Sequence, residues 1–340
     1  MNIAQFDYDL PADLIAQEPA RPRDSSRLLV LHRDRGQTEH RAFRDLPGYL
    51  TGEDVVVLND TRVIRGHLRG RRVPGGGRAE VLLLAERGEG LWEALVRPGR
   101  RLLPGRRIAF GDGELCAEVI DRLPGGGRLL RFTGVPKVMA ALDGIGELPL
   151  PPYIHAALRE ESDYQTVYSR TPGASAAPTA GLHFTPEMMA AVSSRAGSVA
   201  FVTLHIGLST FRPVRAENVE DHEMHEESYA IPEATAQTVS QALRDGRRVV
   251  AVGTSTARAL EAAARADRIT PGEGRTSLFI RPGYRFRVVG GLLTNFHMPR
   301  STLLLLVCAL AGREQILSAY REAIARRYRF LSFGDAMLIV

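Results

Sequence analysis

Four histidines stand at the ends of apolar segments, where a side chain can reach a polar pocket. They are His183, His205, His225 and His297, out of nine histidines in the chain. Imidazole is the side chain that exchanges protons near neutral pH. We therefore expect one pocket that handles protons, although each of these residues taken alone is also typical of a structural histidine.

A second chemical feature is the run Gly253–Thr256, in which a glycine and three hydroxyl residues follow an apolar segment and precede a helical pattern. The free N–H groups of such a turn bind anions. Arg258 stands close behind and is suited to clamp a carboxylate. The run lacks the spacing of an ATP or dinucleotide loop, and an ordinary helix cap is the alternative.

His222 and His225 lie three residues apart among Glu223, Glu226 and Glu227. Metal binding needs ligands that converge in a fixed geometry, and no helical pattern fixes this spacing. We expect no metal here. Acid–base chemistry, binding of a substrate ammonium group and a solvated acidic turn remain open.

Positive charge is concentrated between Thr61 and Arg107, where twelve arginines and four glutamates give a local net charge of +8. The whole chain has a net charge of +5, and Lys137 is its only lysine. The arginine guanidinium group binds phosphate through two parallel hydrogen bonds. The stretch is therefore either a phosphate-binding face or an arginine-rich surface.

Alternating helix and strand patterns position these residues. We predict buried strands at Val55–Leu58, Ser198–His205, Arg248–Val252 and Leu292–Phe296, with helices at Pro186–Ala196, Pro232–Asp245 and Ala257–Asp267 between them. Further strands are predicted at Thr276–Ile280 and Arg285–Val289, and a long helical region at Ser301–Arg327 with a break at Gly312. This alternation predicts an α/β sheet covered by helices.

The sequence pattern changes between residues 63 and 135, where short segments of alternating polarity, typical of strands, are separated by frequent glycines. Two glycine triplets, in Val73–Arg78 and Leu123–Arg128, are typical of hairpin turns. We predict a small antiparallel β-barrel inserted into a larger α/β domain. The division is 1–62 with 148–340 for the α/β domain and 63–147 for the barrel.

Composition excludes several classes of protein. Asp7 and Asp9 stand where a secretory leader is basic, so we expect none. The longest apolar run, Thr302–Ala311, is about half of what a bilayer span needs and predicts a buried helix. Cys116 and Cys308 form no disulfide framework, which fits a reducing cytoplasm. No membrane association and no obligate protein partner are expected, and the oligomeric state is left open.

Ordered motifs along nearly the whole chain match one known family. They include Phe6–Pro11, Leu58–Val63, Leu150–Ile154, Tyr164–Tyr168, Ala177–Thr185, Thr210–Val214, Phe279–Tyr284, Thr294–His297 and Tyr328–Ile339. In these segments the chain resembles the S-adenosylmethionine:tRNA ribosyltransferase-isomerases of queuosine biosynthesis.

The resemblance implies a reaction in which S-adenosylmethionine is a co-substrate and gives its ribosyl part, not its methyl group. The acceptor is the aminomethyl group of a 7-deazaguanine in a tRNA anticodon, and the product is epoxyqueuosine in tRNA. Adenine and methionine leave. A proton is removed from C5′ beside the sulfonium, and no metal is implied.

The same resemblance suggests roles for the matched residues. His205 is the expected base and His183 or His297 the acid, with His225 as a further catalytic residue. Arg258 and Gly253–Ser255 are expected to hold the methionine carboxylate, and Glu227 its ammonium group. The other residues expected to bind the cofactor are Thr179, Gly181, Phe184 and Gly207, and those expected to bind the tRNA substrate are Asn59, Asp60, Arg62 and Asp335.

The chain departs from the family pattern at a few positions. Gly173-Ala174-Ser175 stands where the family has Gly-Ser-Val, and Gly207-Leu208-Ser209 stands where it has Gly-x-Gly. A lost glycine changes the shape of a ligand loop. Two functions therefore stay open, transfer to tRNA and the same chemistry on a small-molecule acceptor. A nucleic-acid-binding module without catalysis is the third reading, and it gives no reason for clustered histidines.

Overall fold

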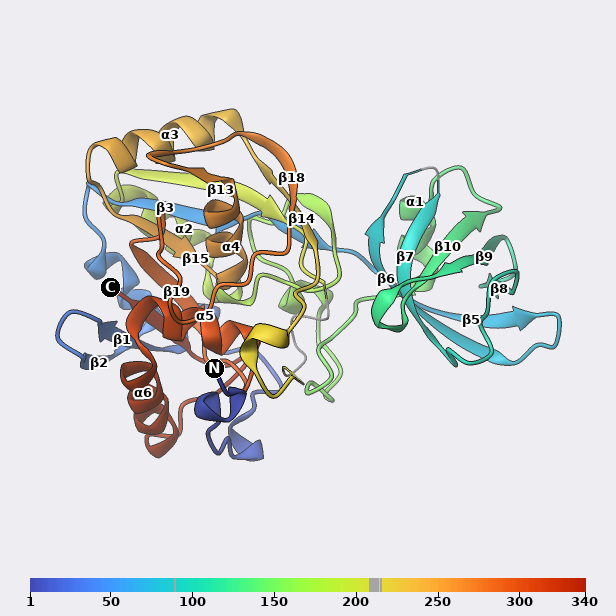
Figure 1. The fold of residues 1–340 in the computed structure, drawn as a ribbon, viewed down its shortest axis with the longest axis horizontal. Coiled ribbons are helices and arrows are strands. Elements are labelled where there is room, and N and C mark those ends of the chain that lie inside the picture. The colour runs from blue at the N-terminus through green and yellow to red at the C-terminus, as the bar shows by residue number, and fades with distance from the viewer. Residues whose placement is uncertain (89, 208–213, 215) are drawn as a thin grey trace. The chain divides into compact units, whose positions relative to one another are not determined.

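The computed structural model describes residues 1–88, 90–207, 214 and 216–340 (Figure 1). The chain forms two compact units. The larger contains Met1–Thr61, Pro151–Thr171 and Ala177–Val340, and the smaller contains Arg62–Leu150 with Pro172–Ala176. The sequence predicted a division into 1–62 with 148–340 and 63–147.

The larger unit is built on a nine-stranded mixed sheet in the order β18-β14-β13-β3-β15-β19-β20-β1-β2. The strands are β1 (Arg27–His32), β2 (Gln37–Ala42), β3 (Val55–Asn59), β13 (Ser198–Leu204), β14 (Glu227–Ile231), β15 (Val249–Val252), β18 (Gly272–Thr276), β19 (Gly291–Asn295) and β20 (Ala336–Ile339). The four neighbours β13, β3, β15 and β19 run parallel. Their carboxyl ends therefore meet at one edge of the sheet, where α/β folds bind ligands.

Helices cover this sheet because its central strands are apolar on both faces, as buried parallel strands are. They are α2 (Pro186–Arg195), α3 (Glu233–Arg244), α4 (Thr254–Ala263), α5 (Thr302–Ala311) and α6 (Arg313–Ala325). Figure 1 shows α3 and α4 lying over the sheet. Alternate residues of one strand, Val56 and Leu58, join a buried cluster with Met188 and Val192 of α2.

Local sequence explains where these helices begin and end. The Thr185 hydroxyl accepts the Met188 N–H and so caps α2, with proline in the first turn as predicted. The predicted break at Gly312 separates α5 from α6, which are bent by 115°. Among the described residues no single helix is long and apolar enough to cross a membrane, and α5 and α6 meet that test only when taken together.

The smaller unit is an antiparallel barrel. Its strands are β5 (His67–Val73), β6 (Arg78–Glu86), β7 (Leu91–Arg97), β8 (Arg107–Phe110), β9 (Leu115–Arg122), β10 (Arg128–Thr133) and β11 (Gly146–Glu147). Pairing of β8 with β5 closes the ring, and β11 extends it beside β5. Trp92, Leu68 and Phe110 are buried in its core. The predicted fold class, an α/β region with a small antiparallel barrel, is confirmed.

Short elements complete the fold. They are α1 (Val138–Ile145), β4 (Thr61–Val63) paired with β12 (Thr171–Ala174), and β16 (Ala264–Arg265) paired with β17 (Arg268–Ile269). The first glycine triplet forms the β5–β6 turn, with positive φ at Gly75 and Gly76. This confirms the predicted hairpin.

Two predicted strands, Thr276–Ile280 and Arg285–Val289, are wrong. The strand in this region is β18, which ends at Thr276, and the segment that follows is irregular. Its backbone is satisfied by a side chain instead of a neighbouring strand. The buried Glu261 carboxylate accepts the N–H groups of Arg287, Val288 and Val289 at 2.9–3.3 Å, which periodicity alone does not reveal.

Candidate active site

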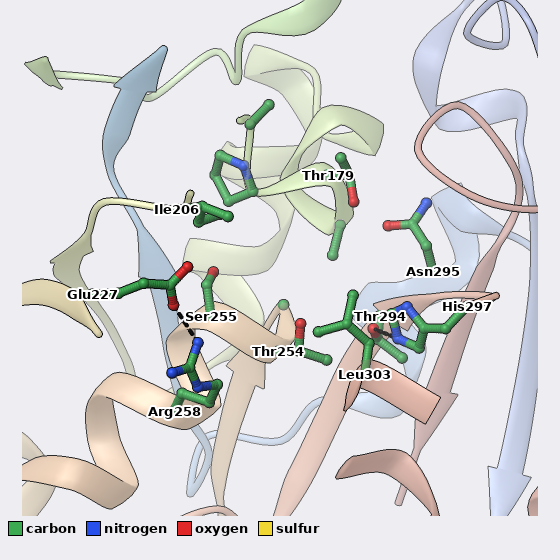
Figure 2. Close-up of a pocket in the computed structure, with 14 residues that line it drawn as sticks. Thr179, Ile206, Glu227, Thr254, Ser255, Arg258, Thr294, Asn295, His297 and Leu303 are labelled. Carbon is green, nitrogen blue, oxygen red and sulfur yellow. Dashed lines mark hydrogen bonds and ion pairs between the residues drawn. The ribbon is translucent and has the colours of Figure 1, made fainter. Parts of the chain in front are cut away.

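A hollow with about 460 Å³ of empty space opens at the carboxyl ends of the parallel strands. The segments after β13, β15 and β19 contribute Ile206, Gly253 and His297 to its wall. Its other lining residues are Ala177, Pro178, Thr179, Ala180, Glu227, Thr254, Ser255, Arg258, Thr294, Asn295 and Leu303 (Figure 2).

One end of the hollow is charged. Glu227, at the start of β14, forms an ion pair with Arg258 of α4, and both side chains are 5 % exposed. The Arg258 Nε donates to the Leu278 carbonyl at 3.2 Å, while its Nη2 is buried with no hydrogen-bond partner among the described residues. Burial without full pairing is costly for a guanidinium. This end therefore has an unused donor for an anionic ligand.

The start of α4 lies beside this pair. Gly253 has φ of +90°, a backbone conformation that favours glycine, and α4 begins directly after it at Thr254. The predicted helix Ala257–Asp267 is therefore wrong at both ends: Gly253 is the cap, Thr254–Thr256 belong to the first turn, and the helix ends at Ala263. Thr254 and Ser255 line the hollow. Their N–H groups stand at the positive end of the helix dipole, next to the Arg258 guanidinium.

The other end of the hollow is made of neutral groups. The His297 Nε2 lies 2.9 Å from the Thr294 hydroxyl, and the His297 N–H donates to Tyr320 Oη at 3.0 Å. Burial lowers the pKa of His297 to about 3. At neutral pH this imidazole is therefore uncharged.

A second hollow, with about 340 Å³ of empty space, adjoins the first. The two share Thr179, Asn295, His297 and Leu303. The second is otherwise mainly apolar, and its remaining lining residues are Tyr153, Phe296, Met298, Ser301, Leu331 and Ser332. Together the hollows offer a charged end, a neutral middle and an apolar end, which suits a ligand with the same sequence of groups.

His183 is buried behind the wall, at the end of the 3₁₀ helix η7 (Thr179–His183). Its Nδ1 lies 2.7 Å from the Ser26 hydroxyl and its Nε2 lies 3.2 Å from the Asn295 amide nitrogen. The ring stacks on Phe43. Burial, aided by Arg329 and Arg23, lowers its pKa to about 3. A neutral imidazole held by two partners is poorly placed to deliver a proton to a ligand.

The other two histidines are not brought to the hollow. The His205 Nδ1 lies 2.8 Å from the Thr61 hydroxyl, and burial lowers the His205 pKa against the opposing effect of Asp60. The next residue, Ile206, takes the place in the wall. His225 is exposed. Of the four histidines, His297 alone is among the described lining residues, so the expected convergence of four imidazoles is not seen.

Among the expected cofactor residues, Thr179 lines both hollows, whereas Gly181 and Phe184 serve packing. A Cβ on Gly181 would lie 2.0 Å from the Tyr168 hydroxyl. Phe184 is fully buried in the cluster under the sheet. The Gly207 N–H donates to Glu227 Oε1 at 3.0 Å and so steadies the charged end.

The four expected tRNA contacts differ in availability. The Asn59 amide is saturated by Leu204, Thr61 and Ser255. Asp60 accepts the Thr203 hydroxyl at 2.7 Å. Arg62 is exposed on β4.

Asp335, the fourth of these residues, is 2 % exposed and already engaged. It accepts N–H groups from Arg27 at 2.9 and 3.2 Å and from Arg329 at 2.8 Å. Asp335 and Asn59 therefore hold the fold together in this structure.

The motif Thr210–Val214 and the loop Gly207–Phe211 fall largely outside the described residues. Within the described ranges, no group of three or more histidine, cysteine or acidic side chains has the arrangement of a metal site.

Sequence reasoning missed part of the wall. Asn295 and Thr294 were noted only as neighbours of His297, although a strand end is the signal that marks them. Leu303 had no signal, since it reaches the hollow only through the packing of α5. Tyr153 and Ser332 of the second hollow join at 2.9 Å through their hydroxyls, a contact between distant parts of the chain.

The fold and the hollow define the class: an α/β protein with an accompanying antiparallel barrel and a hollow at the carboxyl edge of its parallel strands. Comparison with known proteins narrows this class. The family described as "Queuosine biosynthesis protein" matches residues 3–339, and the chain belongs to this family.

Relatives and a solved structure agree with that assignment. The chain is 51 % identical to the S-adenosylmethionine:tRNA ribosyltransferase-isomerase of Symbiobacterium thermophilum over 341 residues and 52 % identical to that of Moorella thermoacetica over 342, with 100 % of each chain covered. The crystal structure of S-adenosylmethionine tRNA ribosyltransferase from Thermotoga maritima covers 99 % of this chain and 100 % of its own, with 39 % identity and a TM-score of 0.58.

Proposed function

We propose that this protein is a ribosyltransferase-isomerase that moves the ribosyl part of S-adenosylmethionine to the aminomethyl-7-deazaguanine of a tRNA anticodon. The products are epoxyqueuosine in tRNA, adenine and methionine. The observation that carries the proposal is full-length identity of about half to relatives with this name, together with a hollow whose charged end suits an amino acid. Because the substrate is a tRNA, we place the activity in the cytoplasm.

The charged end supports S-adenosylmethionine as the ligand. Its methionine part carries a carboxylate and an ammonium group. The free Nη2 of Arg258 and the first N–H groups of α4 would hold the carboxylate, and Glu227 would face the ammonium group. Each charge of the zwitterion would then interact with the oppositely charged member of the Arg258–Glu227 ion pair.

The neutral middle supports proton removal. A C5′ proton beside a sulfonium is weakly acidic, so a base must be held in contact with it. Of the four histidines, His297 alone is among the described residues that line the hollow. On this position we assign the base to His297, whereas the sequence pointed to His205. No residue of the proposed mechanism requires a metal ion.

The names of the relatives favour tRNA over a small-molecule acceptor. The arginine-rich stretch between Thr61 and Arg107 is the expected phosphate contact. Each phosphate neutralised by arginine releases counterions, so affinity for tRNA falls steeply as salt rises.

The test is an incubation of the full chain with S-adenosylmethionine, with and without tRNA that carries the 7-deazaguanine, while adenine and methionine are followed by chromatography. We expect release only with the tRNA, and a KM for tRNA that rises at least tenfold between 50 and 200 mM salt. Release with a free deazaguanine at an equal rate and without salt dependence would favour the small-molecule acceptor. No release in either case would end the proposal.

A further inference from the structure

Asn295 has a buried amide oxygen that no described residue satisfies. The residue is 2 % exposed, ends β19 and lines both hollows. Its Nδ2 donates to the Leu331 carbonyl at 3.1 Å and lies 3.2 Å from the His183 Nε2, whereas its Oδ1 is buried without a partner in the described chain. Such an acceptor is costly unless a ligand supplies the donor.

The orientation of this amide is fixed by its neighbours. A carbonyl oxygen can only accept, so the group facing Leu331 must be the Asn295 nitrogen. The same nitrogen then donates to His183, which must present an unprotonated Nε2 and carry its proton on Nδ1, toward the Ser26 hydroxyl. Ser26, His183 and Asn295 thus form a hydrogen-bonded chain that, with the Leu331 carbonyl, sets the direction in which Oδ1 points.

Figure 2 shows Asn295 on the side of the hollow opposite Glu227 and Arg258, with its amide oxygen directed into the hollow. A ligand whose amino-acid end meets Arg258 therefore extends its far end toward Asn295. Beyond that point the second hollow offers Phe296, Met298 and Leu331 as an apolar wall. A flat ring with an N–H donor at its edge fits this surrounding.

We propose that Asn295 recognises the exocyclic amino group of adenine in S-adenosylmethionine through its free Oδ1, and that His183 is the positioning residue that holds the amide in this orientation. The inference rests on the proposed function and extends it to the recognition of the leaving base. It also gives His183 a role other than the acid expected from the sequence. The lowered pKa of His183 agrees with this role, because a protonated Nε2 could not accept from the amide.

The experiment compares two stable thioether ligands, S-adenosylhomocysteine and S-inosylhomocysteine, by calorimetry on the full-length protein. The second has a carbonyl in place of the amino group and offers Oδ1 a repulsive partner. We expect the parent to bind the adenosyl ligand at least tenfold more tightly. A ratio below twofold in the parent would overturn the proposal without any variant.

Variants then locate the discrimination. Asn295→Ala should bring the ratio close to one by weakening the adenosyl ligand. His183→Phe keeps the stacking on Phe43 but removes the acceptor, so the ratio should fall several-fold. His183→Gln, which retains an acceptor, should keep part of it. Arg258→Ala is the matched control, because it should weaken both ligands equally and leave the ratio unchanged.

Two outcomes separate this inference from the proposed function. A parent that releases adenine in the presence of tRNA but binds both ligands equally would sink the inference alone. An Asn295→Ala variant whose KM for tRNA rises while the ratio is unchanged would also overturn it, since Oδ1 would then face the acceptor base. A parent that releases no adenine and binds neither ligand would sink both.

Discussion

The two ends of the hollow differ in how they treat charge. At one end Arg258 and Glu227 form an ion pair whose two side chains are almost fully buried. At the other end His297 in the wall and His183 behind it are kept uncharged by burial, and hydroxyl and amide groups are their partners. Burial tolerates charges that are paired, whereas it removes the charge of an imidazole that has no charged partner. This difference underlies our proposals that one end holds the zwitterion of the substrate and that the other contains the base and recognises adenine.

The charged end of the hollow could be predicted from the sequence, whereas the roles of the histidines could not. Arg258 and the Gly253 turn were expected to bind a carboxylate because their residue types carry the signal, and both line the hollow. The histidines were expected to act together because their types are the same. Their roles depend instead on burial and partners, which place His297 in the wall, His183 behind it and His225 in solvent.

The largest effect is expected at the charged end. Arg258→Ala removes the unused donor and the cation of the buried ion pair, so we expect the KM for S-adenosylmethionine to rise at least a hundredfold. The unfolding free energy should fall by about 3–5 kcal/mol. Initial-rate kinetics and urea unfolding measure the two effects.

Two further variants separate ligand binding from stability at this end. The double variant Arg258→Met with Glu227→Gln should recover much of the stability without recovering binding, since a buried pair can be replaced by neutral groups. Arg244→Ala, an exposed arginine on α3, is the matched control. If Arg258→Ala bound S-adenosylhomocysteine within threefold of the parent, the two ends would not differ as argued.

The next effect concerns proton transfer at the neutral end. His297→Ala should lower kcat by about a hundredfold, the range of a lost acid–base group, with a smaller change in the KM for S-adenosylmethionine. His225→Ala removes an exposed imidazole and should leave kcat within threefold of the parent. Single-turnover release of adenine is the readout.

His205→Ala sharpens that comparison. If its kcat fell a hundredfold while His297→Ala lost less than tenfold, the base would be His205, as the motif suggested. His205 would then have to leave the Thr61 hydroxyl to reach the sugar. A Thr61→Val variant, which lacks this hydroxyl, would then be more active than the parent. Equal losses in both variants would mean that the two imidazoles act in separate steps.

The fold was more predictable than the site, and particular elements explain why. Val55–Leu58 and Thr302–Ala311 reveal themselves through uninterrupted apolar runs, and α2 through its threonine cap and first-turn proline. The segment Arg285–Val289 looks like a strand by composition, yet its N–H groups are satisfied by Glu261, far away in sequence. The Asn295 oxygen is equally hidden in the sequence, since only the positions of Leu331 and His183 show which way its amide points.

The smallest expected effect is on stability, and it tests the neutral end directly. Burial lowers the pKa of His183 and His297 to about 3, while in the unfolded chain both titrate near 6.5. The unfolded state therefore takes up protons first as pH falls, so the stability that these neutral imidazoles support is complete above about pH 6.5 and is lost progressively below it. Between pH 7.0 and 5.5 each histidine should cost about 1 kcal/mol of unfolding free energy.

His183→Phe should remove the part of this pH dependence that comes from His183, measured by urea unfolding at the two pH values, whereas His225→Ala should not change it. An unchanged pH dependence in His183→Phe would mean that His183 meets solvent or a carboxylate in the folded protein, and the contrast between a charged and a neutral end would fail.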